Sequence, residues 1–190
     1  MERSTVVVAL TGASGSGYGY ELIKGLSSRR EEGVDLILIY NDTALTIMKE
    51  EIGITEDELR GYVGEMVHSS SLGHPLASGS NSFDHLVICP CTTSTASKVH
   101  AGVADNLTTR LASVALKERR RTIMVIRESP LSTPVLKAMY ELSFWGVIIM
   151  PASPPFYELG SDSIRELQRS FAGRILDLLG IDNEMARRYN

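Results

Sequence analysis

Five short apolar runs, separated by segments with helical periodicity, constrain the fold of this 190-residue chain more than any other feature. Each run is continuous rather than alternating, which is typical of a strand that helices cover on both faces. The runs span residues 6–10, 36–40, 86–89, 123–126 and 147–150. Strands that alternate with helices in this way pair in parallel through right-handed crossovers. The sequence therefore predicts a three-layer α/β fold built on a parallel sheet.

The segments between the runs predict helices and one irregular region. Helical patterns cover residues 18–27, 44–51, 105–120 and 133–142, and a last apolar stripe follows Ser163. Asn41 or Asp42, Asp105 and Ser163 are of the residue types that cap helix N-termini. Residues 53–82 predict a short helix followed by a long surface loop. We expect one domain over residues 1–190, with a core of about 5–180 and a short tail at 181–190.

Composition and charge exclude several classes of protein. Hydrophobic residues make up 43% and charged residues 22%, which is globular rather than disordered. The net charge of −4 argues against a nucleic-acid partner, and no apolar run approaches the ~20 residues that span a bilayer. Cys89 and Cys91 suit reduced thiols in a cytoplasm, and a bare C-x-C pair argues against a metal site. We expect a cytoplasmic protein without a metal, a membrane partner or a nucleic-acid partner.

Polar, small or turn-forming residues follow every apolar run. In open parallel sheets, ligands bind beyond the carboxyl ends of the strands. The segments that reach this edge are 11–17, 41–43, 91–95, 127–129 and 151–157. All five segments are polar, small or turn-forming at the same edge of the sheet, which is stronger evidence than any single motif. They predict a site for a polar ligand at that edge.

Two of these segments are candidate anion cradles. The glycine-rich stretch at 11–17 lets backbone N–H groups approach a phosphate, although a tight strand-to-helix turn alone also selects glycine. It lacks the lysine of a Walker loop, and Tyr20 stands where a G-x-G-x-x-G motif has its third glycine, which disfavours a dinucleotide oxidoreductase. The hydroxyl run at 92–95 is either a helix N-cap, an anion site, or both.

The basic residues divide into two groups. Arg110 and Lys117 are seven apart on one predicted helix face, roughly 10 Å apart along its axis. The run at 117–121 is typical of a solvated helix end, an interpretation that covers Arg119 to Arg121. Arg127 and Glu128 differ, because they directly follow a buried strand on the ligand side and must be partnered or functional.

Taken together, these motifs resemble the UbiX/Pad-type flavin prenyltransferases, within the homo-oligomeric flavin-containing Cys decarboxylase-like group. The resemblance covers nearly the whole chain, with the motifs in the same order. The motifs together are specific to this family, although no single motif is. The segments that carry it are TGASG at 11–15, ASGS at 77–80, PC at 90–91, GVADNL at 102–107 with Arg110, ALKERR at 115–120, RESPL at 127–131 and PPFY at 154–157.

The resemblance implies a flavodoxin-like or Rossmann-like subunit that binds FMN between subunits, commonly in a dodecamer. Members of the group join the prenyl unit of dimethylallyl phosphate to N5 and C6 of reduced FMN. The prenylated FMN then serves a UbiD-type decarboxylase. We therefore expect FMN as cofactor, dimethylallyl phosphate as substrate, and homo-oligomers, with a dodecamer as the expected assembly.

The resemblance also implies roles for individual residues. Ser14 lies by the flavin as a proton relay, and a carboxylate of the transfer site matches Glu51 (or Glu50, since the alignment there is loose). Residues implied to bind the flavin are Thr11, Gly12, Ala13, Ser14, Asn41, Thr92, Thr93, Thr95 and Arg110. Residues implied to bind the prenyl phosphate are Lys117, Arg127, Glu128, Tyr157 and Arg174.

Physical chemistry agrees with these implied roles. Fixed cations such as Lys117, Arg127 and Arg174 stabilise the charge that grows on a departing phosphate. Glu128 can orient a cation and accept a proton, so the implied catalytic set is Ser14, Glu51, Lys117, Arg127 and Glu128. The reduced flavin itself is the nucleophile, so no serine or cysteine nucleophile is required.

Departures from the family pattern leave other interpretations open. Thr92-Thr93 after Cys91, Asn41-Asp42, and Ser16-Gly17 all differ from the usual residues beside the flavin. The alternatives are an FMN-dependent oxidoreductase or cysteinyl-peptide-type decarboxylase on the same scaffold, and a flavin carrier without catalysis. Phe144 and Trp145 are candidates for a subunit interface, with core packing nearly as plausible for Phe144.

Overall fold

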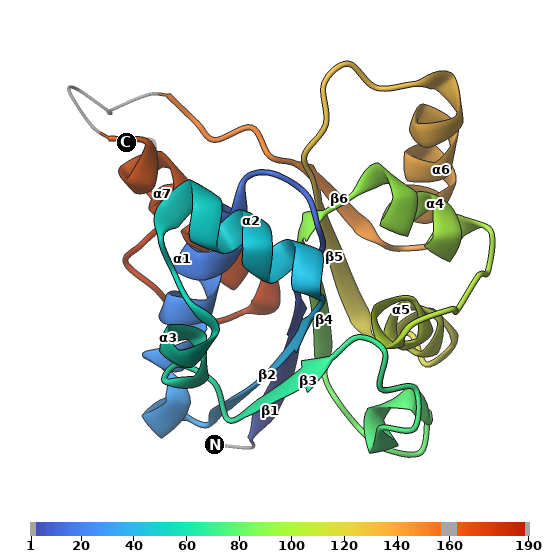
Figure 1. Cartoon of the computed structure of the whole chain (residues 1–190), viewed down its shortest axis with the longest axis horizontal. Coiled ribbons are helices and arrows are strands. Elements are labelled where there is room, and N and C mark those ends of the chain that lie inside the picture. The colour runs from blue at the N-terminus through green and yellow to red at the C-terminus, as the bar shows by residue number, and fades with distance from the viewer. Residues whose placement is uncertain (1–2, 157–162, 189–190) are drawn as a thin grey trace.

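The computed structural model describes residues 3–156 and 163–188, and its centre is a six-stranded, fully parallel sheet (Figure 1). The strand order is β3-β2-β1-β4-β5-β6, the doubly wound order whose switch point lies between β1 and β4. The strands are β1 (Ser4–Ala9), β2 (Val34–Tyr40), β3 (Glu65–His68), β4 (His85–Cys91), β5 (Arg121–Ile126) and β6 (Ile148–Pro151). The predicted three-layer α/β fold is confirmed.

Helices cover both faces of the sheet (Figure 1). On one face lie α1 (Ser16–Ser27), α2 (Asp42–Ile52), α3 (Glu56–Arg60) and α7 (Ile164–Leu179). On the other lie α4 (Thr93–His100), α5 (Leu107–Lys117) and α6 (Thr133–Phe144). Two 3-10 turns, η1 (Arg30–Glu32) and η2 (Pro75–Ala77), join elements at the periphery. Within the described residues, no helix is long and apolar enough to cross a bilayer.

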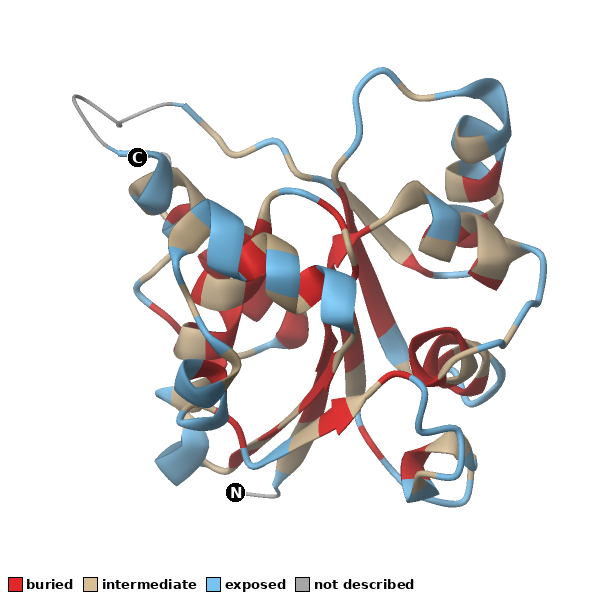
Figure 2. Ribbon diagram, in the orientation of Figure 1, coloured by how far each residue is buried: buried red, intermediate tan, exposed pale blue. Residues whose placement is uncertain are grey.

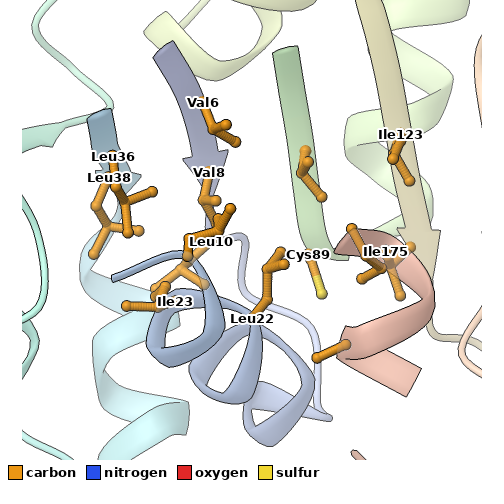
Figure 3. Close-up of a cluster of buried hydrophobic side chains, with 14 of the residues drawn as sticks. Val6, Val8, Leu10, Leu22, Ile23, Leu36, Leu38, Cys89, Ile123 and Ile175 are labelled. Carbon is orange, nitrogen blue, oxygen red and sulfur yellow. The ribbon is translucent and has the colours of Figure 1, made fainter. Parts of the chain in front are cut away.

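The two faces of the sheet form two separate hydrophobic cores. Val6 and Val8 of β1 point to the first core, and Val7 and Ala9 point to the second, because side chains alternate across a strand. Figure 3 shows the first core, where strand residues meet Leu22 and other side chains of α1 and α7. Figure 2 shows that buried residues lie in the central strands and on the helices that pack on them. Burial on both faces explains why the strands read as continuous apolar runs.

One strand and one helix cap differ from the prediction. Residues 65–68 were expected in a surface loop, but they form β3, a short edge strand that pairs only with β2. Its sequence, Glu-Met-Val-His, holds no apolar run because only Val67 of the four is buried. Asp105 does not cap α5; the side chain of Asn106 accepts the N–H of Thr109 at 3.0 Å instead, and Asp105 pairs with Lys98.

The end of the chain packs back on α7. Asn183 donates from Nδ2 to the carbonyl of Gly173 at 3.2 Å, and Arg188 forms an ion pair with Asp177 at 2.9 Å. A side chain on Gly173 would collide with the backbone of Ala186. Residues 181–188 of the predicted tail therefore form part of the packed domain.

Candidate functional site

The glycine turn between β1 and α1 forms the centre of the site. Gly15 is the N-cap of α1 in the left-handed conformation, with φ 94°, which only glycine adopts without strain. Gly12 is required for another reason: a Cβ there would lie 2.6 Å from Cγ2 of Thr43. The turn therefore holds its backbone close to the start of α2.

Glu51 of α2 binds the start of α1. Its carboxylate accepts the N–H of Gly15 at 2.9 Å and both the N–H and the hydroxyl of Ser16 at 2.8 Å. Burial alone would raise the pKa of Glu51, but hydrogen bonds from Ser14, Ser16 and the backbone hold it below its ordinary value. Glu51 is therefore a carboxylate at neutral pH, at a helix end that favours negative charge.

The structure brings Ser14 into contact with this carboxylate and distinguishes two neighbouring acids. The Ser14 hydroxyl donates to Glu51, whereas the Glu50 side chain is exposed and has no hydrogen bond or ion pair within the described residues. Of the two carboxylates that the resemblance left open, Glu51 is the one at the glycine turn. Ser16 was not predicted as part of this cluster; its only sequence signal was its place directly after Gly15.

The hydroxyl run follows β4 and is tied to the glycine turn. Thr11 donates to the carbonyl of Pro90 at 2.8 Å and accepts the N–H of Thr92 at 2.9 Å, so its hydroxyl joins two strand ends. Thr92 caps α4 by accepting the N–H of Thr95 at 3.1 Å, as predicted. The backbone N–H of Thr93, in the first turn of α4, is one of the donors that a helix leaves unpaired. These free donors fit an anion.

Asn41 and Ala13 complete this edge. Asn41 caps α2 by accepting the N–H of Ala44 at 2.8 Å, which leaves its side-chain amide nitrogen available for a ligand. Ala13 is buried within the glycine turn. The carboxyl ends of β1, β2 and β4 thus meet as predicted.

Arg127 is the least satisfied side chain at this edge. It follows β5, and its Cγ lies 3.4 Å from where a Cβ on Gly15 would stand. Its Nε is inaccessible to solvent and has no hydrogen-bond partner in the part of the chain described. A buried cationic donor without an acceptor is costly, and its position beside an anion-favouring turn fits a bound anionic group. The neighbouring Glu128 is exposed and accepts the N–H of Ser129 at 3.0 Å.

Arg174 lies in a separate hollow beyond the end of β6. We call it the donor hollow, after the prenyl donor that the resemblance assigns to Arg174. It has a volume of about 410 Å³ and is lined by Met150, Pro155, Phe171 and Arg174, among others. Phe171 also contacts the Tyr18 ring of α1, with 5.0 Å between ring centroids. Arg174 forms an ion pair with Asp177. Tyr157, expected beside these groups, lies outside the described residues.

Lys117 and Arg110 do not join the other cations within one chain. Lys117 ends α5, only four residues before β5 begins, and so lies at the amino ends of the strands. It pairs with Glu118, and Arg110 donates from Nε to the carbonyl of Ala77 at 2.9 Å. Lys117 therefore lies at the opposite end of its own chain's sheet from Arg127, because α5 runs antiparallel to the strands. Its assignment to the prenyl-phosphate pocket stays a prediction.

The two cysteines are not available as nucleophiles or ligands. Both are fully buried, and burial raises the pKa of Cys91 to about 12. A thiol with that pKa stays protonated at neutral pH. The described residues contain no group of three or more side chains that could hold a metal ion.

Comparisons with known proteins agree on one family. The flavoprotein family model matches residues 1–151. The flavin prenyltransferase UbiX of Methanothermobacter thermautotrophicus is 41% identical over 184 residues, which cover 97% of this chain and 94% of that protein. A crystal structure of AnUbiX (PadA1) with FMN and dimethylallyl pyrophosphate superposes with a TM-score of 0.93 at 33% identity and covers 100% and 98% of the two chains. A dodecameric, FMN-dependent UbiX-like decarboxylase from Escherichia coli O157:H7 superposes with a TM-score of 0.92 at 31% identity, over 98% and 99%.

Proposed function

Because the chain belongs to the UbiX family of flavin prenyltransferases, we propose that it transfers a dimethylallyl group from dimethylallyl phosphate to N5 and C6 of reduced FMN. The prenylated FMN is then passed to a UbiD-type decarboxylase. The observation that carries this proposal is the set of anion-binding groups at the carboxyl ends of the strands. Arg127, with its buried and unpartnered Nε, lies there beside the glycine turn and the Ser14–Glu51 pair.

The edge of the sheet fits FMN. Free N–H groups at Thr93, the Asn41 amide and the Thr92 and Thr95 hydroxyls offer donors to a phosphate and a ribityl chain. The glycine turn at Gly12 presents backbone rather than side chain, so a flat ring can approach it closely. Bound there in its reduced form, the flavin supplies the electron-rich atoms that accept the prenyl group.

We assign a proton-transfer role to Ser14 and Glu51, which are hydrogen-bonded to each other at this edge. Glu51 is ionised at neutral pH, since hydrogen bonds from Ser14 and Ser16 lower its pKa. A serine that donates to a carboxylate can take up a proton on its oxygen as it gives its own proton to that carboxylate. We assign Ser14 as the residue that passes the proton and Glu51 as the acceptor.

The cations stabilise the departing phosphate. Arg127 and Arg174 come from the same chain, and we assign to Glu128, exposed after β5, the role of orienting a cation. Fixed positive charge stabilises developing negative charge without reorganisation. Tyr157 is assigned to the same group from the resemblance alone.

Lys117 and Arg110 serve the site of a neighbouring copy in this proposal. Within the described residues, Arg110 contacts the carbonyl of Ala77 and Lys117 pairs with Glu118, and neither is bonded to the glycine turn of its own chain. An active site shared between subunits uses them without any change in the fold. We propose a homo-oligomer, with a dodecamer as the assembly, because the similar Escherichia coli protein is dodecameric.

An exposed apolar stripe on α6 supports assembly. Leu136, Tyr140 and Phe144 are spaced four residues apart and are 49%, 71% and 83% exposed, so they share one helix face. Exposure of Phe144 excludes the core interpretation for that residue. A contiguous apolar surface of this kind marks an interaction site.

Since both cysteines are free thiols, we place the protein in the cytoplasm.

The test is an anaerobic reaction of the protein with reduced FMN and dimethylallyl phosphate. We expect a flavin heavier by one C5H8 unit, detected by mass spectrometry of the extracted cofactor. Arg127→Met should bind FMN but form little product, because it lacks the cation beside the glycine turn. A flavin of unchanged mass would refute the proposal, and loss of CO2 from a cysteinyl peptide would favour the decarboxylase alternative.

Mixing two inactive variants tests the shared site. Lys117→Ala and Arg127→Met impair opposite halves of a site that two copies share. Co-assembly should restore about a quarter of the wild-type activity, because random mixing pairs two intact halves in that share of sites. If both residues serve the same chain's site, the mixed assembly stays inactive.

A further inference from the structure

A second hollow lies at the opposite end of the sheet from the glycine turn. It has a volume of about 770 Å³ and is bordered by the first residues of β1, β4, β5 and β6 and by the C-terminal ends of α5 and α6. We call it the basic hollow. Its lining includes Arg3, His85, Arg119, Arg120, Arg121 and Trp145. Its size falls within the range of roughly 300–1,000 Å³ that is usual for small-molecule sites.

Positive charge is concentrated in the basic hollow. Four arginines line it, whereas Asp84 is the only carboxylate among the described residues of the lining. The Asp84 side chain already accepts the N–H of Thr5 at 2.7 Å. The chain as a whole carries a net charge of −4, so this local excess runs against the overall balance. A concave basic surface concentrates anions.

Carboxylates compensate the four guanidinium charges only in part: Arg120 helps to lower the pKa of Glu118, and its guanidinium lies 4.4 Å from the centroid of the Phe83 ring. Arg120 donates to the carbonyls of Asn81 and Gly79, and Arg121 donates to the carbonyl of Leu178; these acceptors are neutral. Arg3 pairs with Asp35 at 3.6 Å, but its side chain is 80% exposed, so that pair is weak. The Arg119 side chain has no hydrogen bond or ion pair in the part of the chain that the structure describes.

The backbone places Arg119 at the hollow. Its φ of 57° makes it the single non-glycine residue with positive φ among residues 3–156 and 163–188. Left-handed backbone is strained for an L-residue other than glycine. Glycine or asparagine would satisfy this turn without that strain. The sequence has arginine at this position instead. A solvated helix end, as predicted for Arg119 to Arg121, does not require a cation on strained backbone.

An aromatic wall completes the basic hollow. Trp145 lines it and is 41% exposed. Its ring is stacked on His100, with centroids 5.4 Å apart and the planes 8° from parallel. Stacking fixes the ring in place, and Trp145 is the only tryptophan in the chain. Its fluorescence therefore reports on this hollow and on a neighbouring one of about 720 Å³ that Trp145 also lines.

We propose that the basic hollow binds a small ligand with two or more linked phosphate groups. Several separate guanidinium groups fit a chain of phosphates better than a single ion, because each can bind its own oxygens bidentately. The basic hollow is separate from the glycine turn and Arg127 of the same chain, since these lie at the other end of the strands. Free polyphosphate and the phosphate chain of a nucleotide share this chemistry.

The test titrates FMN-loaded protein with inorganic tripolyphosphate and with ATP, read by calorimetry and by Trp145 fluorescence. Arg119→Gln removes a charge that forms no hydrogen bond or ion pair with the described residues, so folding should be unaffected. We expect it to weaken binding about tenfold or more, as loss of a charge-assisted contact implies. Arg3→Gln should weaken binding in the same direction. Lys137→Gln, an exposed cation on α6, is the matched control and should bind as the wild type does.

The outcomes separate the basic hollow from other sites. Equal affinity for tripolyphosphate and ATP means that the phosphate chain suffices, and tighter ATP binding places the base against Trp145. Both results support the proposal. It is overturned if Arg119→Gln and Arg3→Gln bind as tightly as the wild type, or if Arg174→Gln abolishes binding, which would put the ligand in the donor hollow. Prenyl transfer is measured separately, so its failure would not be confused with either result.

Discussion

Replacing Glu51 with glutamine should destabilise the fold through the start of α1. The carboxylate accepts two backbone N–H groups, from Gly15 and Ser16, at 2.9 and 2.8 Å, and the Ser16 hydroxyl at 2.8 Å. Gly15 offers no side-chain cap of its own, so Glu51 acts as the cap from another helix. Glutamine keeps one acceptor oxygen but loses the charge that favours a helix N-terminus.

The expected loss is about 1 kcal/mol of unfolding free energy. Removal of a helix cap costs about 0.5–2 kcal/mol, and we take the middle of that range because the Glu51 side chain is exposed and its charge is screened. For a chain of this length, that corresponds to a fall in Tm of about 2–4 °C. Urea unfolding at a fixed protomer concentration measures the loss, since assembly makes apparent stability depend on concentration.

The effect should depend on pH in one direction. Hydrogen bonds lower the pKa of Glu51 in the folded state below its ordinary value of 4.5. Its contribution is therefore complete above that value and is lost as the pH falls through the lower, folded-state pKa. The difference between wild type and Glu51→Gln should therefore shrink as the pH falls below 4.5 and through the folded-state pKa. Glu50→Gln, an exposed neighbour, is the matched control and should show neither effect; equal stability of Glu51→Gln and wild type at pH 7 would refute the capping argument.

Two further predictions follow from packing. Gly12→Ala would put a Cβ 2.6 Å from Cγ2 of Thr43, so it should cost about 1–3 kcal/mol in chemical unfolding; Thr43→Ser in the same chain removes that methyl and should restore part of the loss, and no rescue would contradict the cause. Cys89 and Cys91 are fully buried and burial raises both pKa values, that of Cys91 to about 12. A thiol reagent at pH 8 should therefore label neither in the folded protein and both after denaturation, and rapid labelling of the folded protein would show that the strand end opens.

The sequence predicted the strands well because burial on both faces leaves a plain signal. Val6, Val8 and their neighbours are apolar without interruption, since each face of β1 meets a core. The edge strand β3 gave no such signal, because it has one neighbour and only Val67 is buried. Helix caps were predictable only to the residue type: Asp105 and Asn106 are both suitable, and backbone geometry selects Asn106.

The candidate site was predictable where residues directly follow strands. Ser14, Thr92 and Arg127 lie at the expected edge because the carboxyl ends of parallel strands share one side of the sheet. Lys117 was assigned to the prenyl-phosphate pocket by its place in a motif. The direction of α5 takes it to the other end of its own chain's sheet, so this assignment stays a prediction that the position of the residue within one chain does not test. The pairing of Glu51 with Gly15 could not be predicted, because it depends on how α2 packs against the glycine turn.

The coupling between phosphate release and flavin modification tests the central claim most directly. In a single turnover with enzyme-bound reduced FMN and dimethylallyl phosphate, inorganic phosphate and prenylated flavin are measured from the same samples. The cations at the carboxyl ends of the strands are proposed to release phosphate only as the prenyl group bonds to the flavin, so both products should appear together in equal amounts. Phosphate released without reduced flavin, or flavin of unchanged mass after phosphate release, would contradict the account.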